Sequence, residues 1–180
     1  MIRFFKNSAN FLLLIFLFFA LTGCVSTTRL PIATSTPWQE VQLAVEDNPL
    51  DIAFVDDDHG FLVGANRLIR ETNDGGSTWI ERKLDIASEE NFRLISIDFS
   101  GDEGWLVGQP ALVMHTNDAG KNWTRLVLGN KLPGNPYLIK TLGPDSAELA
   151  TTAGAVYRTM DGGSNWEGRV AEASGGVRDL

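Results

Sequence analysis

The hydrophobic and polar positions from residue 49 onwards alternate in short runs that turn residues separate. The first four runs cover about residues 50–55, 61–64, 68–71 and 79–84. Alternation over four to eight residues, bounded by Gly, Asp and Asn, predicts a strand with one buried face. We therefore expect four short antiparallel strands here. The same pattern further along the chain predicts an all-β fold.

The pattern of runs recurs with a period of 43 or 44 residues. An eight-residue segment that begins with Thr and ends with Trp occurs at residues 72–79, 116–123 and 159–166. Upstream of it, Phe61-Leu-Val-Gly64 matches Trp105-Leu-Val-Gly108 at a shift of 44 residues. Four strands in ~40–50 residues, repeated in register, are typical of a β-propeller blade.

This period predicts a β-propeller of four-stranded blades, about three of which the chain contains. The blades are expected at about residues 50–84, 94–128 and 137–170, with a fourth beginning at residue 177. Residues 38–43 begin with Trp like each fourth strand but follow no turn segment. They predict an orphan outer strand, of the kind that closes the last blade of a propeller. Closed propellers have ~4–8 blades.

The repeated segment, Thr-x-Asp-x-Gly-x-x-Trp, predicts a tight turn between the third and fourth strands of each blade. Its Asp carboxylate can accept backbone N–H bonds, its Gly permits a positive φ, and its Trp packs between sheets. The pattern resembles the Asp box, a structural turn of several propeller families. The residues expected in this role are Thr72, Asp74, Gly76 and Trp79, then Thr116, Asp118, Gly120 and Trp123, and finally Thr159, Asp161, Gly163 and Trp166.

The first 23 residues have the features of a signal peptide. Arg3 and Lys6 precede an unbroken apolar run over residues 11–21, which is too short to span a bilayer as a helix. The run ends in Leu-Thr-Gly-Cys24, which resembles the bacterial lipobox. Cys24 is therefore the predicted lipidation site and would anchor the protein to a membrane. Residues 24–37, rich in Ser, Thr and Pro, predict a tether.

Composition and charge exclude several classes of function. The 180 residues have a formal net charge of −8 and include one Cys and two His. Nucleic-acid binding is not expected, because phosphates require clustered Lys and Arg. A single Cys excludes an internal disulfide and a thiolate zinc site, and two His leave little material for metal chemistry. We expect neither a cofactor nor a metal ion.

An acidic run, Asp56-Asp-Asp-His59, contains residue types that can bind a metal. The repeat argues against this role, because Asp58 aligns with Asp102 and Asp145, which lie in equivalent turns. We therefore predict a solvated turn between the first two strands of the blade.

His115 immediately precedes the second Asp box. The repeat aligns it with Glu71 and Arg158. A position that accepts Glu, His and Arg predicts an exposed strand residue rather than a ligand. The sequence also contains no nucleophile elbow, P-loop, zincin motif or Rossmann glycine pattern.

Sialidases also carry Asp boxes, so a glycosidase is one alternative function. Their catalysis needs an arginine cluster and a Tyr/Glu pair, usually with an Arg-Ile-Pro segment. The nearest match, Phe92-Arg-Leu94, lacks the proline, and Tyr137 and Tyr157 belong to ordinary blade strands. We expect no catalytic residue. The other alternative is a generic surface lipoprotein that acts as a binding module.

Several motifs, taken in their order and spacing, resemble the photosystem II assembly and stability factor family of cyanobacteria and chloroplasts. They are the Cys24 site, the strand that opens at Trp38, Leu50-Asp-Ile-Ala-Phe54, His59-Gly-Phe-Leu-Val-Gly64 and the first Asp box. The resemblance implies a seven-bladed propeller of roughly 300 residues. Residues 38–180 are then a partial propeller, the N-terminal portion of a longer protein.

The resemblance also implies a function. Members of the family are not enzymes; they bind the newly made D1 reaction-centre subunit and early assembly intermediates at the lumenal side of the thylakoid membrane, and the cyanobacterial members are lipoproteins. Family binding is attributed to a basic patch. In a chain with net charge −8 such a patch must be concentrated locally, and the candidates are Arg67, Arg158 and Arg178.

Overall fold

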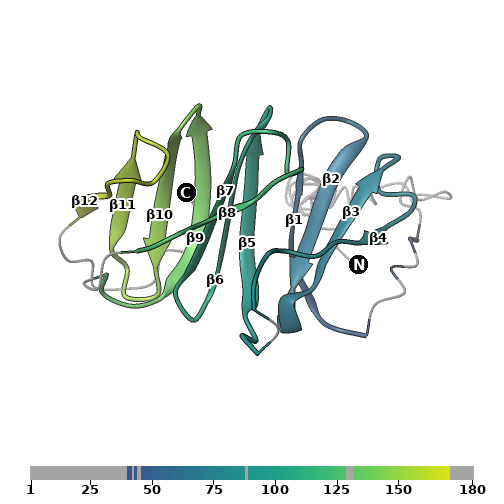
Figure 1. The fold of residues 1–180 in the computed structure, drawn as a ribbon, viewed down its shortest axis with the longest axis horizontal. Helices are drawn as coiled ribbons and strands as arrows, with labels where there is room; N and C mark the ends of the chain where they lie inside the picture. The colour runs from purple at the N-terminus through teal and green to yellow at the C-terminus, as the bar shows by residue number, and fades with distance from the viewer. Residues whose placement is uncertain (1–39, 42, 44–45, 88, 129–131, 171–180) are drawn as a thin grey trace, which may run out of the picture. The chain divides into compact units, whose positions relative to one another are not determined.

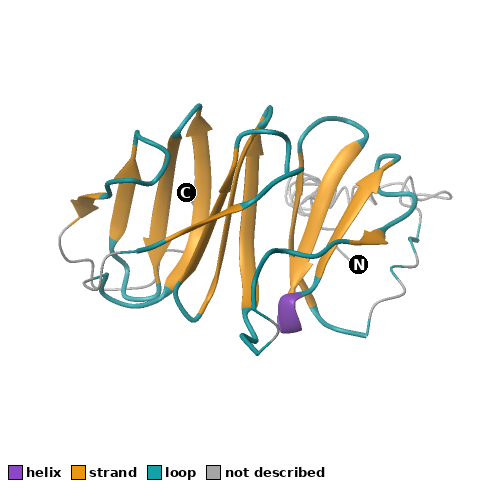
Figure 2. Ribbon diagram, in the orientation of Figure 1, coloured by secondary structure: helices purple, strands orange, loops and turns teal. Residues whose placement is uncertain are grey.

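The computed structural model describes residues 40–41, 43, 46–87, 89–128 and 132–170. In this part of the chain twelve strands form three four-stranded antiparallel sheets, which lie side by side in chain order (Figure 1). The one helical element among these residues is a short 3₁₀ turn, η1 (Ala65–Arg67), between the second and third strands (Figure 2). The prediction of an all-β fold with about three four-stranded blades is confirmed.

Each sheet keeps its strands in chain order, so that short turns join neighbouring strands as in a propeller blade. The first sheet contains β1 (Pro49–Phe54), β2 (His59–Gly64), β3 (Ile69–Asn73) and β4 (Ile80–Glu81). The second contains β5 (Arg93–Ser100), β6 (Glu103–Gln109), β7 (Leu112–Thr116) and β8 (Thr124–Leu126). The third contains β9 (Pro136–Gly143), β10 (Ser146–Thr151), β11 (Val156–Thr159) and β12 (Glu167–Val170).

One outer strand is shorter than expected, and another lies only partly within the described residues. The strand expected over residues 79–84 is reduced to the two residues of β4, which lies at the sheet edge and pairs only with β3. Residues 40, 41 and 43, the described part of the expected orphan strand, form no strand. The expected strand would complete a blade other than the three described sheets, each of which has its own fourth strand, so it stays a prediction. The expected signal peptide, Cys24, the tether and the start at residue 177 lie outside the described residues.

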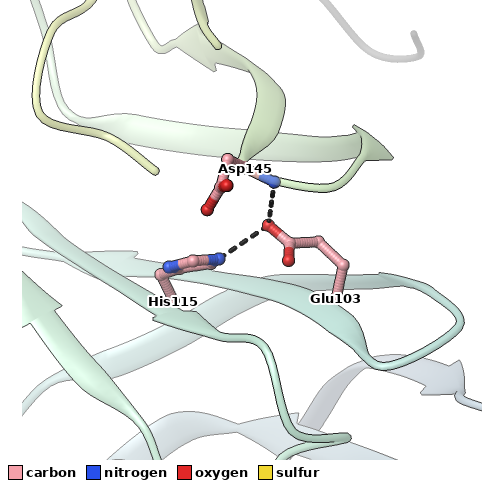
Figure 3. Close-up of side chains that lie close together, drawn as sticks. All are labelled: Glu103, His115 and Asp145. Carbon is pink, nitrogen blue, oxygen red and sulfur yellow. Dashed lines mark hydrogen bonds and ion pairs between the residues drawn. The ribbon is translucent and has the colours of Figure 1, made fainter. Parts of the chain in front are cut away.

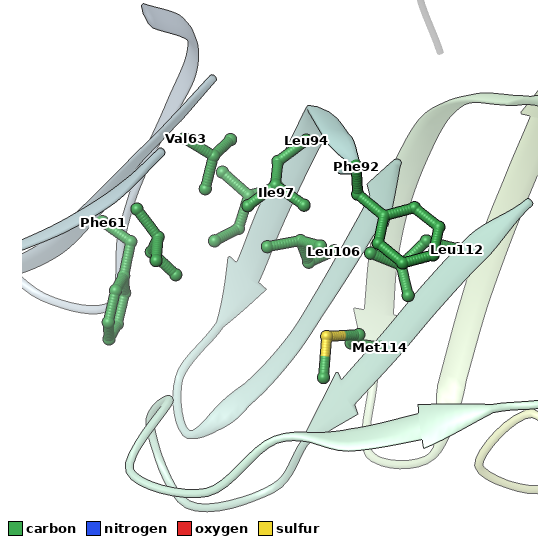
Figure 4. Close-up of a cluster of buried hydrophobic side chains, with 9 residues drawn as sticks. Phe61, Val63, Phe92, Leu94, Ile97, Leu106, Leu112 and Met114 are labelled. Carbon is green, nitrogen blue, oxygen red and sulfur yellow. The ribbon is translucent and has the colours of Figure 1, made fainter. Parts of the chain in front are cut away.

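The first hydrophobic core lies between the first and second sheets (Figure 4). On β2 and β7 the contributing residues are two apart, as the period of two in a strand requires. On β5 they are three apart, because the register shifts between Leu94 and Ser96. The members of this core are Phe61, Val63, Ile69, Phe92, Leu94, Ile97, Leu106, Leu112 and Met114. All of them are buried, so this interface resembles the interior of a domain.

The second hydrophobic core lies between the second and third sheets. Its members are Trp105, Val107, Val113, Ile139, Ala147 and Leu149. Strand β6 contributes to both cores, because Leu106 faces the first sheet while Trp105 and Val107 face the third. A central strand that is buried on both faces reads as a continuous apolar run, and Trp105-Leu-Val107 is such a run.

The turn between β7 and β8 packs directly against the sheet that precedes it. Trp123 meets the Phe61 ring edge-on, with centroids 6.2 Å apart and planes at 88°. A Cβ atom on Gly120 would lie 2.5 Å from the Phe61 ring, so only glycine leaves room for this contact. The third sheet repeats the arrangement: Trp166 meets Trp105 edge-on at 5.7 Å, and a Cβ on Gly163 would lie 3.3 Å from the Trp105 ring.

We predict that Gly120→Ala destabilises the protein by about 3 kcal/mol. Gly120 has a φ of 78°, where an L side chain costs ~1–2 kcal/mol, and the new methyl group would also overlap the Phe61 ring, at a cost of ~1–3 kcal/mol. Gly101 is a matched control, because its φ is 61° but no atom lies within 4 Å of the added Cβ. Gly101→Ala should cost only about 1 kcal/mol in urea unfolding. Equal costs for the two variants would contradict the packing role of Gly120.

Candidate functional site

The three Asp boxes share one set of hydrogen bonds. In the second box the Thr116 hydroxyl donates to Asp118 Oδ1 at 2.8 Å and accepts the backbone N–H of Gly120 at 3.1 Å. The backbone N–H and the side-chain amide of Asn122 donate to Asp118 Oδ1 and Oδ2 at 2.9 and 2.7 Å. Both carboxylate oxygens are therefore bonded within the turn.

The other two boxes repeat these contacts with small changes. Asp161 accepts the backbone N–H and side-chain amide of Asn165 at 2.9 and 2.8 Å. Asp74 accepts the backbone N–H of Thr78 at 2.8 Å and its hydroxyl at 2.6 Å. Thr and Asn both provide a donor at this position, which explains why the box tolerates either. These are the contacts of turn-forming residues.

The hydrogen bonds lower the pKa of each box aspartate, because they favour its charged form. The pKa of Asp118 falls to about 2, mainly through the backbone N–H of Asn122. The pKa values of Asp74 and Asp161 are also lowered, chiefly by the side chains of Thr78 and Asn165. The boxes are therefore fixed carboxylates with filled acceptor sites, which makes them poor general acids or bases.

A second turn in each sheet holds the box in place. In each sheet an aspartate of the turn between the first two strands accepts, through its backbone carbonyl, a backbone N–H from the Asp box at 2.9 Å. The acceptor and donor pairs are Asp58 and Gly75, Asp102 and Ala119, and Asp145 and Gly162. The acidic run in the first sheet is an exposed turn in which Asp56 Oδ1 accepts the N–H groups of Asp58 and His59. Its three carboxylates form no metal cluster with the described residues.

The expectation of an exposed strand position for Glu71 and His115 is wrong. Glu71 is 9% exposed, and its carboxylate contacts His59 Nε2 at 2.8 Å and Arg82 Nε at 3.1 Å. Arg82 also reaches the backbone carbonyls of the next sheet's Asp box, those of Gly120 and Lys121. The strand position held by Glu71 and His115 therefore faces a neighbouring sheet rather than solvent. Aligning the repeats shows which residues are equivalent, but not which way their side chains point.

The second sheet contains the same pair with its members exchanged between strands (Figure 3). Glu103 on β6 accepts a hydrogen bond from His115 Nε2 on β7 at 2.6 Å and another from the backbone N–H of Asp145 in the third sheet at 2.8 Å. A shift of 44 residues aligns His59 with Glu103 and Glu71 with His115. This exchange is the sequence signal that could have revealed a buried pair.

The cluster of Glu103, His115 and Asp145 contains donor types that can bind a divalent cation, with one potential ligand atom of each within 4.8 Å of the others. However, Glu103 Oε1 already accepts two hydrogen bonds, one of them from His115 Nε2. We therefore assign the cluster a structural role as a polar joint between the second and third sheets.

Of the three arginines predicted as candidates for a docking patch, Arg67 and Arg158 lie on different sheets. Arg67 lies in η1 of the first sheet and donates to the carbonyl of Ala87 at 3.3 Å. Arg158 lies on β11 of the third sheet, 3.5 Å from Glu148. Arg178 lies outside the described residues. Arg67 instead shares a surface hollow of about 340 Å³ with Arg82 and Lys83, which sequence analysis did not select.

The fold and the repeated turn define the class of protein as an Asp-box β-propeller. A family model described as "Photosynthesis system II assembly factor YCF48" matches residues 30–180. The chain therefore belongs to the photosystem II assembly factor YCF48 family, and the resemblance drawn from the sequence motifs is confirmed.

Two relatives illustrate the similarity. The "Photosystem II assembly lipoprotein Ycf48" of Prochlorococcus marinus is 75% identical over 178 residues, which are 99% of this chain and 52% of the relative. The protein of the same name from Parasynechococcus marenigrum is 64% identical over 180 residues, 100% of this chain and 54% of the relative. The chain thus spans about half the length of the curated relatives it matches.

Solved structures agree with this assignment. One described as "YCF48 bound to D1 peptide" has a TM-score of 0.78 and 45% identity, covering 84% of this chain and 50% of that one. "YCF48 from Cyanidioschyzon merolae" has a TM-score of 0.69 and 44% identity, covering 76% and 41%. An ancestral GH74 enzyme, 16% identical with a TM-score of 0.53, covers 71% of this chain and 19% of the enzyme and shares the fold alone.

We predict that Asp118 contributes stability above about pH 4 and loses it towards pH 2. Its pKa is lowered on folding to about 2, so the folded state favours the charged form. This stability is complete above the unfolded pKa of ~3.9 and disappears as the pH falls through the folded value. Melting temperatures of the wild type and Asp118→Asn, measured from pH 6 to pH 2, should converge as the pH falls. A difference that is constant with pH would contradict this assignment.

We predict that Glu103→Ala costs about 2 kcal/mol of stability, because it leaves the partly buried donors on His115 and the Asp145 backbone without their acceptor. Glu81→Ala is the control: Glu81 is 63% exposed and lies 3.9 Å from Arg70, so its loss should cost less than about 0.5 kcal/mol. Guanidinium unfolding measures both. A similar small cost for the two variants would show that the polar joint is not stabilising.

Proposed function

We propose that the protein is a non-enzymatic assembly factor for photosystem II that binds the newly made D1 subunit and early assembly intermediates. The observation that carries this proposal is the match to a structure described as "YCF48 bound to D1 peptide" at 45% identity over 84% of the chain. Over the aligned residues, which are 50% of that structure, the two chains share the same backbone fold, with a TM-score of 0.78. The names of the relatives support the same role in photosystem II assembly.

The site geometry favours a docking role over catalysis. The box aspartates are bonded within their turns, and the histidines at residues 59 and 115 are both bonded to buried glutamates. These side chains are engaged with neighbouring residues of the fold, which supports a structural role for them. Short turns on packed sheets instead provide a rigid, polar surface for binding another protein. The likeness to a GH74 enzyme concerns the fold and favours no glycosidase activity.

We place the protein at the lumenal side of the thylakoid membrane, held there by lipid on Cys24. The relatives are named lipoproteins, which supports the anchor. No helix among the described residues is long and apolar enough to cross a bilayer. Two or more acyl chains on one cysteine give stable attachment, whereas a single chain gives weak and reversible binding.

The function is tested by affinity purification of the tagged full-length protein from solubilised thylakoids. We expect D1 and early assembly partners in the eluate, because the protein binds them directly. Cys24→Ala is the matched variant: it should leave the membrane fraction yet still bind an immobilised D1 peptide. Absence of D1 from the wild-type eluate would overturn the proposal. Hydrolysis of a fluorogenic sialoside by the purified protein would favour the glycosidase alternative.

A further inference from the structure

The innermost strand of every sheet contains a β-bulge at the same place. On β1 the register moves from Pro49 to Asp51 while β2 moves by one residue, so Leu50 has no opposite partner. On β5 the unpaired residue is Ile95, and on β9 it is Tyr137. A bulge redirects the side chain of its extra residue, and bulges are frequent beside functional sites. Three bulges in register, each with an apolar residue, indicate a built feature.

The three bulge residues line one groove of about 420 Å³ across β1, β5 and β9, which we name the bulge groove. Leu50 and Tyr137 are each 38% exposed, and Ile95 is half-buried, although the sheets pack most of their other apolar side chains into the cores. The bulge groove is lined by Leu50, Asp51, Arg93, Ile95, Ser96, Gln109, Tyr137, Leu138 and Thr152. It is therefore an apolar floor with a polar rim, as is common for sites that bind a ligand.

Arg93 is the cation of this groove. It is exposed and forms no ion pair with any described residue, whereas Arg70, Arg82, Arg125 and Arg158 each have a carboxylate partner. The acidic residue of the groove, Asp51, forms no ion pair with Arg93, because its carboxylate is bonded to the backbone. The Asp51 carboxylate accepts the backbone N–H of Ile52 and of Ile97, both at 2.9 Å. A ligand in the groove therefore meets one available positive charge beside apolar side chains.

The backbone of the groove suits an extended chain. Strands β1, β5 and β9 are the edge strands of their sheets, and a bulge leaves the extra residue without a ladder partner. Part of these edges is occupied, because the N–H groups of Ile97, Ile139 and Thr141 donate to side chains of the preceding inner strand. An extended segment is therefore held in the groove mainly by its side chains, whose alternation provides specificity. The chemistry that complements this surface is an extended peptide with apolar side chains on either side of a carboxylate.

We propose that the bulge groove is the site where a partner protein docks an extended segment, with apolar residues against Leu50, Ile95 and Tyr137 and an Asp or Glu carboxylate on Arg93. The proposal deepens the proposed function and rests on it for the identity of the partner. It assigns the docking contact to the groove rather than to the arginines at residues 67, 158 and 178.

Fluorescence anisotropy with the full chain tests this assignment. The probes are labelled heptapeptides of alternating leucine and threonine whose central residue is aspartate, asparagine or lysine. We expect the aspartate peptide to bind about tenfold more tightly than the asparagine peptide, and the lysine peptide to bind most weakly. Arg93→Gln should remove the preference for aspartate. Arg169→Gln is the control, since Arg169 is also exposed and forms no ion pair with the described residues but lies outside the groove.

The apolar floor is tested in the same assay. Tyr137→Ser should weaken all three peptides about tenfold, whereas Met160→Ser, at a residue that is 74% exposed but outside the groove, should change none. Unchanged melting temperatures of these surface variants would show that the fold is intact. Equal binding of the aspartate and lysine peptides, or equal effects of Arg93→Gln and Arg169→Gln, would overturn the proposal.

Recovery of D1 separates this proposal from the proposed function. The comparison uses the wild type and a double variant with both Arg93→Gln and Tyr137→Ser. If the two proteins recover D1 equally well, the groove assignment is overturned while the proposed function stands. If the peptides bind as expected but D1 is never recovered, the proposed function fails, and the groove is supported as the docking site of a different partner. Loss of D1 in the double variant with retention in the Arg169→Gln control supports both.

Discussion

The contact of the second and third Asp boxes with an aromatic ring of the preceding sheet is the constraint on which the arrangement of the three sheets depends. Gly120 and Gly163 allow the box backbone to lie against Phe61 and Trp105, and the box tryptophans meet the same rings edge-on. The turn is rigid because its carboxylate accepts several donors. Local turn chemistry and packing between sheets are therefore one feature, since a distorted turn would lose the ring contact as well.

Polar joints reinforce the same end of the first and second sheets. The Glu–His pair of the first sheet bonds to Arg82, which reaches the next box, and the pair of the second sheet bonds to the backbone of Asp145. In the first sheet the second strand provides the histidine and the third the glutamate, and in the second sheet the roles are reversed. The Glu–His interaction is therefore kept although the residue at each position differs. Such a joint is stabilising only when every buried group has a partner, and both joints satisfy this requirement through an additional contact.

The opposite end of each sheet has a different character. There the inner strands contain bulges, and apolar side chains that could have been buried are directed into a groove beside Arg93. Boxes, ring contacts and polar joints at one end leave the other end free to vary its exposed side chains. A rigid scaffold with one open end is well suited to binding an extended segment, because few of its own side chains and loops lose conformational entropy on binding.

The sequence by itself determined the blade architecture, the position of each Asp box and the family, because these features depend on local chemistry repeated every 43 or 44 residues. A period of two along a strand shows which residues share a face, but not which face meets another sheet. Only the tertiary structure placed Glu71 and His115 between sheets, separated Arg67 from Arg158, and brought Leu50, Ile95 and Tyr137 into one groove. These placements depend on one-residue shifts in strand register and on contacts between residues about 44 positions apart in the sequence. The alternation of hydrophobic and polar residues along a strand encodes neither of them.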